Sequence, residues 1–166
     1  MVGPGGAGKS TFSEALAART GLPVVHLDRW YWKPGWVEPD RAEWETIQSD
    51  LVAAECWIAD GNYGGTLDLR LGRADAVIVL APSRLVCILG VLGRSLRHHG
   101  EAVQAAGCPE RVTVEFLRWV WRYPIDSRPR LGAAIGRHPH LEVIELTSRR
   151  MAAAWLRELE GHVGGR

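Results

Sequence analysis

The first chemically distinctive segment of the chain is a glycine-rich loop close to Met1. Residues 3–10 match the pattern G-x-x-x-x-G-K-[ST] at every fixed position. Glycines in such a loop allow backbone N–H groups to turn inward around a phosphate, which side chains would obstruct. A glycine-rich turn formed by chance is the alternative, and the helical pattern that follows directly argues against it. We therefore predict a nucleoside-triphosphate site here.

Each residue of this loop has an expected role. Lys9 should reach the β- and γ-phosphates, and the Ser10 hydroxyl should ligate Mg²⁺. Thr11 opens a helix whose positive N-terminus faces the same anions. The chain has only two lysines, Lys9 and Lys33, and one of them lies in this loop. The predicted nucleotide contacts are Gly3, Gly5, Gly6, Ala7, Gly8, Lys9, Ser10 and Thr11.

A carboxylate that follows an apolar run is the candidate for the second Mg²⁺ ligand. Trp57-Ile58-Ala59 leads into Asp60, which places Asp60 at the carboxyl end of a strand. That edge is where doubly wound sheets bind their ligands. The alternative is that Asp60 only caps the turn that follows.

Asp28 is a second carboxylate at the end of an apolar run, and an aromatic cluster follows it at residues 30–36. It could orient an acceptor hydroxyl or take its proton, while the aromatic rings stack on a planar or sugar-like substrate. A turn carboxylate beside a packed aromatic loop is the alternative. His26 lies two residues earlier, but a single His-x-Asp pair does not predict a metal site.

Phosphoryl transfer needs cations to match the developing charge. Arg94 and Arg97 have the i, i+3 spacing that puts them on one helix face, and they resemble a phosphate clamp carried by a lid. Residues 84–130 hold eight arginines against four acidic residues. A solvated helix face with extended arginines is the alternative.

The bulk properties set limits on the class of protein. A chain of 166 residues is expected to form a single domain, residues 1–166, with a lid and substrate segment at about 94–130. Its net charge of +1 gives no support for bulk attraction to nucleic acid or to an acidic membrane. Three scattered cysteines, no charged leader and no apolar run long enough to span a bilayer favour a cytoplasmic protein.

Alternating apolar runs and helical stretches predict the scaffold, an α/β fold with a parallel sheet between helices. We expect strands at 23–27, 56–59, 76–81 and 141–146, and helices at 9–19, 40–55, 83–98, 110–123 and 149–160. Asp40 and Glu43 form a capping box for the second helix, and Pro124 should end the fourth. Only Met1 and Val2 precede the glycine loop, whereas a strand needs about five residues. The first strand is therefore expected to be truncated, through a late start codon or trimming, and upstream apolar residues should add stability.

With these residues placed, the chain resembles the adenylate-kinase-like P-loop kinases, and more narrowly the topology modulation (FlaR-like) proteins. The resemblance spans nearly the whole chain and rests on the segments at 3–11, 26–36, 57–63 and 73–84. It implies a P-loop NTPase fold with a five-stranded parallel sheet, an ATP site at the glycine loop and a small helical lid that carries arginines. Asp60 matches the acidic residue of the Asp-Gly motif of nucleotide kinases, and Asp28 matches a substrate-side carboxylate of small-molecule kinases. Asn62-Tyr63 stands where nucleotide kinases usually carry an aromatic-Pro-Arg sequence, which weakens a nucleoside monophosphate as the acceptor.

The expected function is transfer of the γ-phosphoryl group of ATP to a small-molecule or nucleotide acceptor, with Mg²⁺ as cofactor. Lys9, Asp28, Arg94 and Arg97 are the predicted catalytic residues, and Ser10 and Asp60 the predicted Mg²⁺ ligands. Two alternatives stay open. One is a nucleotide-dependent regulator of DNA or of a protein partner, supported by the basic 84–130 segment. The other is a pseudo-kinase that binds ATP without an acceptor.

Overall fold

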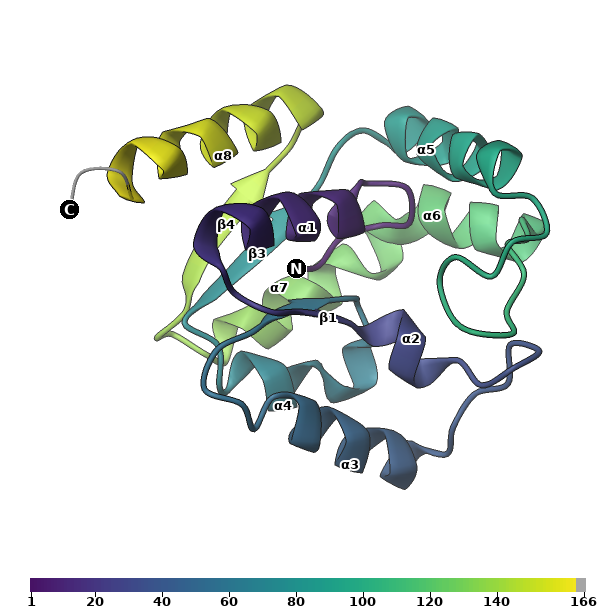
Figure 1. Cartoon of the computed structure of the whole chain (residues 1–166), viewed down its shortest axis with the longest axis horizontal. Coiled ribbons are helices and arrows are strands. Elements are labelled where there is room, and N and C mark those ends of the chain that lie inside the picture. The colour runs from purple at the N-terminus through teal and green to yellow at the C-terminus, as the bar shows by residue number, and fades with distance from the viewer. Residues whose placement is uncertain (164–166) are drawn as a thin grey trace.

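A computed structural model describes residues 1–163, with side chains described as far as residue 159. Four short strands form two parallel two-stranded sheets (Figure 1). In the first, β1 (Val24–His26) pairs with β2 (Ile58–Asp60), and in the second, β3 (Ala76–Leu80) pairs with β4 (Glu142–Leu146). All four strands lie within two residues of the runs expected from the sequence, so these predictions are confirmed.

Met1 and Val2 lie between the two sheets and hydrogen-bond to both. The Met1 N–H donates to the Ala59 carbonyl at 2.7 Å, and the Gly61 N–H donates to the Met1 carbonyl at 3.2 Å. Val2 exchanges backbone hydrogen bonds of 3.0 and 2.9 Å with β3. The predicted single five-stranded sheet is therefore not observed, because two residues do not extend far enough to form a strand between β2 and β3.

Nine segments of the described chain are helical. The predicted helices correspond to α1, α3, α5, α6 and α8, whereas α2, η1, α4 and α7 were not predicted because they are short or follow one another closely. Their bounds are α1 Lys9–Thr20, α2 Leu27–Tyr31, α3 Arg41–Leu51, η1 Gly64–Thr66, α4 Leu67–Leu71, α5 Arg84–Arg97, α6 Val114–Asp126, α7 Arg128–Gly136 and α8 Arg149–Val163.

Of the two helix boundaries that the sequence predicts from single residues, one is confirmed and one is wrong. The Asp40 side chain caps α3 by accepting from the Glu43 N–H at 2.8 Å, as the capping pattern predicts. The expectation that Pro124 ends the fourth helix is wrong, because Pro124 lies inside α6. A proline in the last turn costs only one hydrogen bond, and the helix continues until the Ser127 N–H bonds the Tyr123 carbonyl at 3.0 Å.

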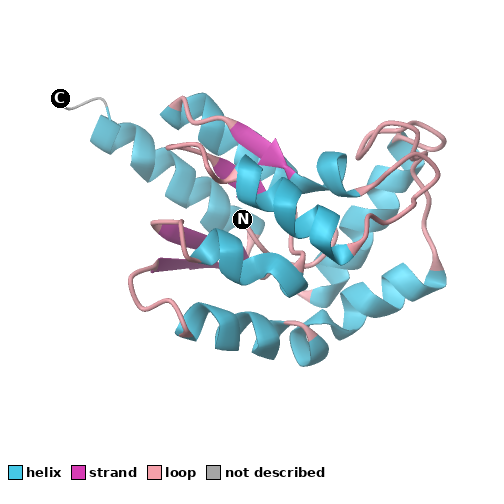
Figure 2. Cartoon of the chain, turned by 90° about the horizontal axis from the view of Figure 1, so that it is seen from below, coloured by secondary structure: helices cyan, strands magenta, loops and turns pink. Residues whose placement is uncertain are grey.

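The strands lie between two layers of helices (Figures 1 and 2). Ile78 and Leu80 of β3 face one core, with α1, α5, α6 and α8. Val77 and Val79 alternate with them and face a second core, with α4 and α7. This alternation is what a strand buried on both faces requires. Within the described residues no helix is long and apolar enough to cross a membrane.

Candidate functional site

The glycine loop runs from Val2 to the first turn of α1 in the conformation that its glycines allow. Gly6 and Gly8 have φ values of 76° and 92°, in the left-handed region. A Cβ atom at Gly6 would lie 2.0 Å from the Cys87 carbonyl oxygen of α5. A Cβ atom at Gly90 of α5 would lie 2.3 Å from the Gly6 oxygen. Close contact between loop and helix therefore requires glycine on both sides.

Lys9 lies under this loop and already contacts its backbone. The Nζ atom donates to the carbonyls of Gly3 at 3.0 Å and Pro4 at 3.1 Å. Burial lowers the pKa of Lys9, although the negative charges of Asp60 and Asp28 oppose that effect. The ammonium group is thus held at the loop by two backbone acceptors.

Asp60 ends β2 and combines one engaged oxygen with one free oxygen. Its Oδ2 atom lies 3.1 Å from Nδ1 of His26, whose Nε2 lies 2.7 Å from Oε1 of Glu14. The Oδ1 atom is buried and has no hydrogen-bond partner. Burial alone would raise the pKa of Asp60, but the His26 hydrogen bond and the charge of Lys9 outweigh it and hold the pKa below its usual value.

The environment of Asp60 fits the predicted Mg²⁺ site. An unpaired buried carboxylate oxygen is a hard ligand of the kind that Mg²⁺ prefers, and the Ser10 side chain lies near enough to Asp60 to help lower its pKa. Among the described residues, no group of three or more His, Cys, Asp or Glu is arranged to hold a metal ion. Phosphate and water would have to complete the coordination, as they do at nucleotide sites.

Asp28 does not end a strand, because the helix α2 begins one residue before it. Its Oδ1 atom accepts a hydrogen bond of 2.5 Å from the Tyr63 hydroxyl. Burial, together with the negative charge of Asp28, raises the pKa of Tyr63 and keeps the phenol protonated as a donor. Tyr63 has a φ of 40°, a strained conformation for a non-glycine residue of the kind that clusters at functional sites.

The two predicted arginines have different environments. Arg94 donates from Nε to Oε1 of Glu110 at 3.0 Å, and the buried Glu110 accepts a second bond of 2.8 Å from Gln104. This network fixes the Arg94 side chain at the cleft. Arg97 is exposed at the rim, and no charged partner is described for it.

A single cleft of about 990 Å³ brings most of the predicted residues together. Gly3 and Ala7 are the exceptions, since both are buried beneath the loop surface. The predicted residues that line the cleft are Gly5, Gly6, Gly8, Lys9, Ser10, Thr11, Asp28, Asp60, Arg94 and Arg97.

One end of the cleft is closed by two loops that sequence reasoning did not connect. The Gly35 N–H donates to the Gly107 carbonyl at 2.9 Å, and the Trp36 indole donates to the Pro109 carbonyl at 3.1 Å. The Arg111 guanidinium lies 5.3 Å from the centre of the Trp36 ring, in cation–π contact. Trp36 has a φ of 64°, so it is a second strained residue that lines the cleft.

Two residues outside the predicted set hold the floor of the site. The Asn62 carboxamide pairs with both main-chain groups of Gly3, at 2.9 and 2.7 Å. The buried Arg70 of α4 donates to the carbonyls of Gly61 at 2.8 Å, of Asn62, and of Tyr63 at 3.3 Å. The only sequence signal for Arg70 is a cation between apolar neighbours in a short helical stretch.

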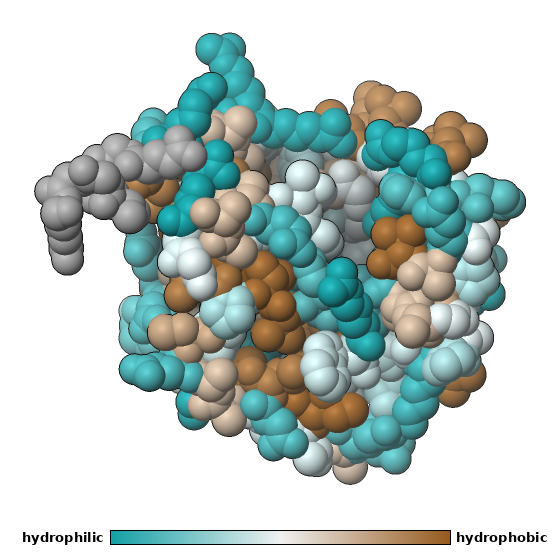
Figure 3. Space-filling model, viewed as in Figure 1, coloured by the Kyte–Doolittle hydropathy of each residue, from teal (hydrophilic) through white to brown (hydrophobic). Residues whose placement is uncertain are grey.

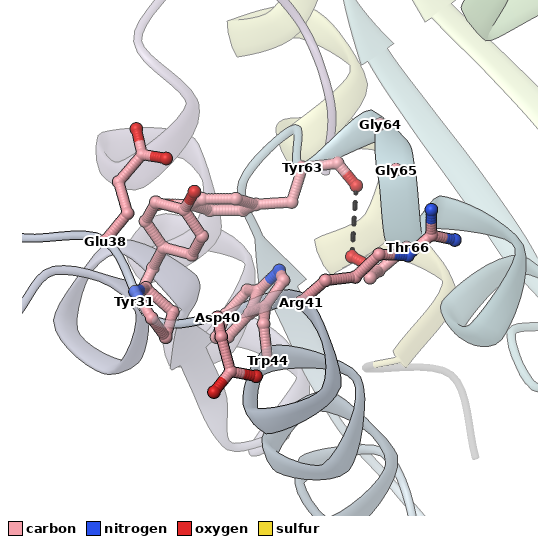
Figure 4. A pocket seen from close by; sticks show the side chains of 10 residues that line it. Tyr31, Glu38, Asp40, Arg41, Trp44, Tyr63, Gly64, Gly65 and Thr66 are labelled. Atoms are coloured by element: carbon pink, nitrogen blue, oxygen red, sulfur yellow. Dashed lines mark hydrogen bonds between the residues drawn. The ribbon is translucent and has the colours of Figure 1, made fainter.

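A second, smaller pocket of about 450 Å³ lies on the other side of Tyr63. Figure 4 shows the rings of Tyr31, Trp44 and Tyr63 gathered along one side of it, with Gly64, Gly65 and Thr66 opposite. The three ring centroids lie 4.5–5.0 Å apart, so these rings pack as one cluster that supports Tyr63 from behind.

Comparison with known proteins supports the fold. No protein-family model matches the chain, and no curated protein matches it. A solved structure of a putative kinase from Chloroflexus aurantiacus superposes with a TM-score of 0.51 at 15% identity, over 96% of this chain and 95% of that one. At this identity the likeness extends to the fold alone, and it shows that the chain has a mixed α/β fold similar to that of the solved structure.

Proposed function

We propose that the protein is an ATP-dependent phosphotransferase. The observation that carries the proposal is the single cleft in which the glycine loop, Asp60, Asp28 and Arg94 face one another. A donor-binding loop alone would fit any nucleotide-binding protein. A second carboxylate and a fixed arginine across the same cleft are what a transfer site needs in addition.

The donor half binds the triphosphate of ATP. Backbone N–H groups of residues 5–10 surround the phosphates, and Lys9 exchanges its loop carbonyls for phosphate oxygens. Ser10 and Oδ1 of Asp60 would hold Mg²⁺, which would neutralise negative charge on the phosphates. His26 keeps the Asp60 carboxylate turned toward Ser10 by occupying its other oxygen.

The acceptor half lies around Asp28. A hydroxyl placed against Asp28 donates its hydrogen bond to the carboxylate, which directs the oxygen lone pair toward the γ-phosphorus and takes the proton as the new P–O bond forms. The bond from the γ-phosphorus to the bridging oxygen breaks at the same time, and ADP leaves with its electron pair. The Tyr63 hydroxyl already occupies Oδ1, so Oδ2 is the oxygen that serves the acceptor. Arg94, held by Glu110, and Arg97 at the rim supply positive charge to the transferring group.

Isothermal titration calorimetry with ATP and Mg²⁺ tests the donor half. Lys9→Ala should weaken ATP binding at least tenfold, because it removes the only lysine at the phosphates. Lys33→Ala is the matched control, since the side chain of the other lysine pairs with Glu43 at 2.7 Å on an exposed surface. Equal ATP affinity in wild type and Lys9→Ala would refute the donor site.

Release of ADP on addition of candidate acceptors tests the acceptor half. Nucleoside monophosphates and small hydroxyl compounds form the first panel, because the cleft carries both aromatic rings and arginines. ATP binding without turnover on any acceptor would favour the pseudo-kinase instead.

A further inference from the structure

Four leucines leave one face of α5 apolar and uncovered. Leu85, Leu89, Leu92 and Leu96 have exposed fractions of 64, 67, 39 and 84%. Their spacing of four, three and four residues places all of them on one stripe of an α-helix. In Figure 3, hydrophobic side chains project at the top right, where Figure 1 places α5. We call these four residues the leucine stripe.

Exposed side chains of the neighbouring helix enlarge this apolar surface. Val114, Trp121 and Ile125 of α6 are exposed by 67, 46 and 56%. The Arg84 guanidinium at the start of α5 lies 5.5 Å from the centre of the Trp121 ring, so the first turn of α5 contacts the exposed side of α6. The seven apolar side chains together expose roughly 800 Å², about the area that each partner contributes to a stable protein interface.

A surface of this size exceeds what a soluble monomer normally leaves uncovered, since patches beyond a few hundred Å² usually mark an interaction site. The middle of the stripe is bordered by Val86, Ile88, Gly93 and Ser95, none of which is charged, and Arg84 and Arg97 lie at its two ends. Leu89 and Leu92 of two copies can therefore pack together in the middle of the stripe without opposing like charges. The spacing also matches the seam along which two helices interlock their side chains.

Charge argues against a membrane surface as the partner. An interfacial membrane helix carries free basic residues on its polar face. Two of the three arginines of α5 are instead engaged within the protein: Arg94 is bound to Glu110 at 3.0 Å, and Arg84 lies over an aromatic ring. Arg97 remains as a single exposed cation, which is fewer than the several Lys and Arg of an interfacial membrane helix. We propose that the leucine stripe is the interface of a symmetric homodimer, in which α5 of one copy packs against α5 of a second copy.

This interface would lie behind the candidate site and not inside it. The side of α5 that faces the glycine loop carries Gly90, which contacts Gly6, and Arg94, which lines the cleft. The leucine stripe is on the outer side of the same helix. The proposal therefore does not depend on whether the cleft transfers a phosphoryl group.

Molar mass in solution tests the proposal. Light scattering coupled to gel filtration, and sedimentation velocity over a range of micromolar concentrations, should give the mass of two chains for the wild type. The double variant Leu89→Glu/Leu96→Glu should run as a monomer with an unchanged circular dichroism spectrum, because both residues are exposed. Leu69→Glu is the matched control: Leu69 of α4 is exposed by 39%, like Leu92, and its variant should stay dimeric.

A wild type that is monomeric at every concentration would overturn the proposal, including one that instead co-sediments with anionic lipid vesicles. A dimer that survives the double variant would also overturn it, because another surface would then hold the copies together.

Cross-linking gives an answer even if the double variant fails to fold. Cys56 is the exposed cysteine of the chain, and Cys87 and Cys108 are buried. In a Cys56→Ser background, Leu92→Cys should form a disulfide-linked dimer when oxidised glutathione is added, and Leu69→Cys should not. Equal cross-linking of the two variants, or none with Leu92→Cys, would refute the leucine stripe as the interface.

Discussion

The carboxamide of Asn62 pairs with both main-chain groups of Gly3: its Oδ1 accepts from the Gly3 N–H at 2.9 Å, and its Nδ2 donates to the Gly3 carbonyl at 2.7 Å. The same Gly3 carbonyl accepts from Lys9. One side chain from the turn after β2 thus performs the pairing that a neighbouring strand would otherwise give to the start of the glycine loop.

Asn62→Ala should therefore destabilise the protein and loosen the loop. Gly3 is buried, and the substitution leaves its N–H without an acceptor, whereas its carbonyl keeps the Lys9 donor. An unsatisfied buried polar group costs about 1–3 kcal/mol. We expect a loss of about 2 kcal/mol in the free energy of unfolding, measured by urea denaturation. ATP affinity should fall as well. Ser49→Ala is the control, because the exposed Ser49 hydroxyl bonds only to the Glu45 carbonyl of its own helix. An equal loss of stability in the two variants would contradict the role of Asn62.

Arg70 is expected to be a positioning residue for both halves of the site. It binds the three successive carbonyls of residues 61–63, and through them it holds Asn62 under Gly3 and Tyr63 against Asp28. Burial lowers the pKa of Arg70 to about 10, so the guanidinium stays charged at neutral pH and keeps all its donors.

Arg70→Lys should lower kcat and ATP affinity together, because an ammonium group cannot span three carbonyls as a planar guanidinium does. Arg70→Met should cost stability in addition, by about 3 kcal/mol for acceptors left without donors. Arg41→Met provides the control, since Arg41 is exposed and pairs only with Glu45 on its own helix. Full activity of Arg70→Lys would contradict the positioning role of Arg70, because the turn at residues 61–63 would then not need the guanidinium.

Asp28 should affect turnover and leave donor binding intact. Asp28→Asn removes the proton acceptor while it preserves the size of the side chain, so kcat should fall by about 10²–10⁴, the usual contribution of a general base. Calorimetric ATP affinity should stay within about twofold of the wild type, which is a difference of about 0.4 kcal/mol. Asp50→Asn, at an exposed position of α3, should change neither quantity.

Tyr63→Phe separates positioning from catalysis at the same carboxylate. It removes the 2.5 Å hydrogen bond to Asp28 but leaves the carboxylate in place. The KM for the acceptor should therefore rise more than kcat falls. A Tyr63→Phe enzyme as inactive as Asp28→Asn would mean that the phenol itself takes part in the chemistry.

The contribution of Asp68 to the free energy of unfolding should be lost in acid. Hydrogen bonds from Arg137 and His138 hold the pKa of Asp68 below its ordinary value of 3.8 and tie α4 to α7. A carboxyl group whose pKa is lower in the folded state contributes its stability fully above the unfolded pKa and loses it as the pH falls through the folded value.

Urea titrations of wild type and Asp68→Asn at several pH values measure this effect. The difference in unfolding free energy should be constant near neutrality and should shrink below pH 3.8. It should be small, because the side chain is half exposed and exposed ion pairs contribute little. A difference that grows as the pH falls would contradict the assignment.

Much of the scaffold could be predicted because its signals are local. The four strands appear as short apolar runs, and the capping of α3 as an Asp and a Glu three residues apart. The short helices α2 and α4 and the close succession of α6 and α7 were missed. In each of these places packing against neighbours outweighs a weak or contrary local preference, as it does at Pro124.

The amino-acid sequence by itself determined the glycine loop, and it indicated Asp60, Asp28 and Arg94 as partners across a cleft. For Asp60 that was possible because the carboxyl ends of parallel strands meet at one edge of a sheet. Asp28 lies in α2 and Arg94 in α5, so the sequence indicated these two residues, whereas the packing of the helices decided their places. Only the tertiary structure decided which atoms meet: Asp28 with Tyr63, His26 with Asp60, and Arg70 with the turn at 61–63. These contacts join residues that lie on different elements, and hydrogen bonds depend on register and side-chain direction to within a fraction of an ångström. No local pattern carries that information, because it arises when the elements pack.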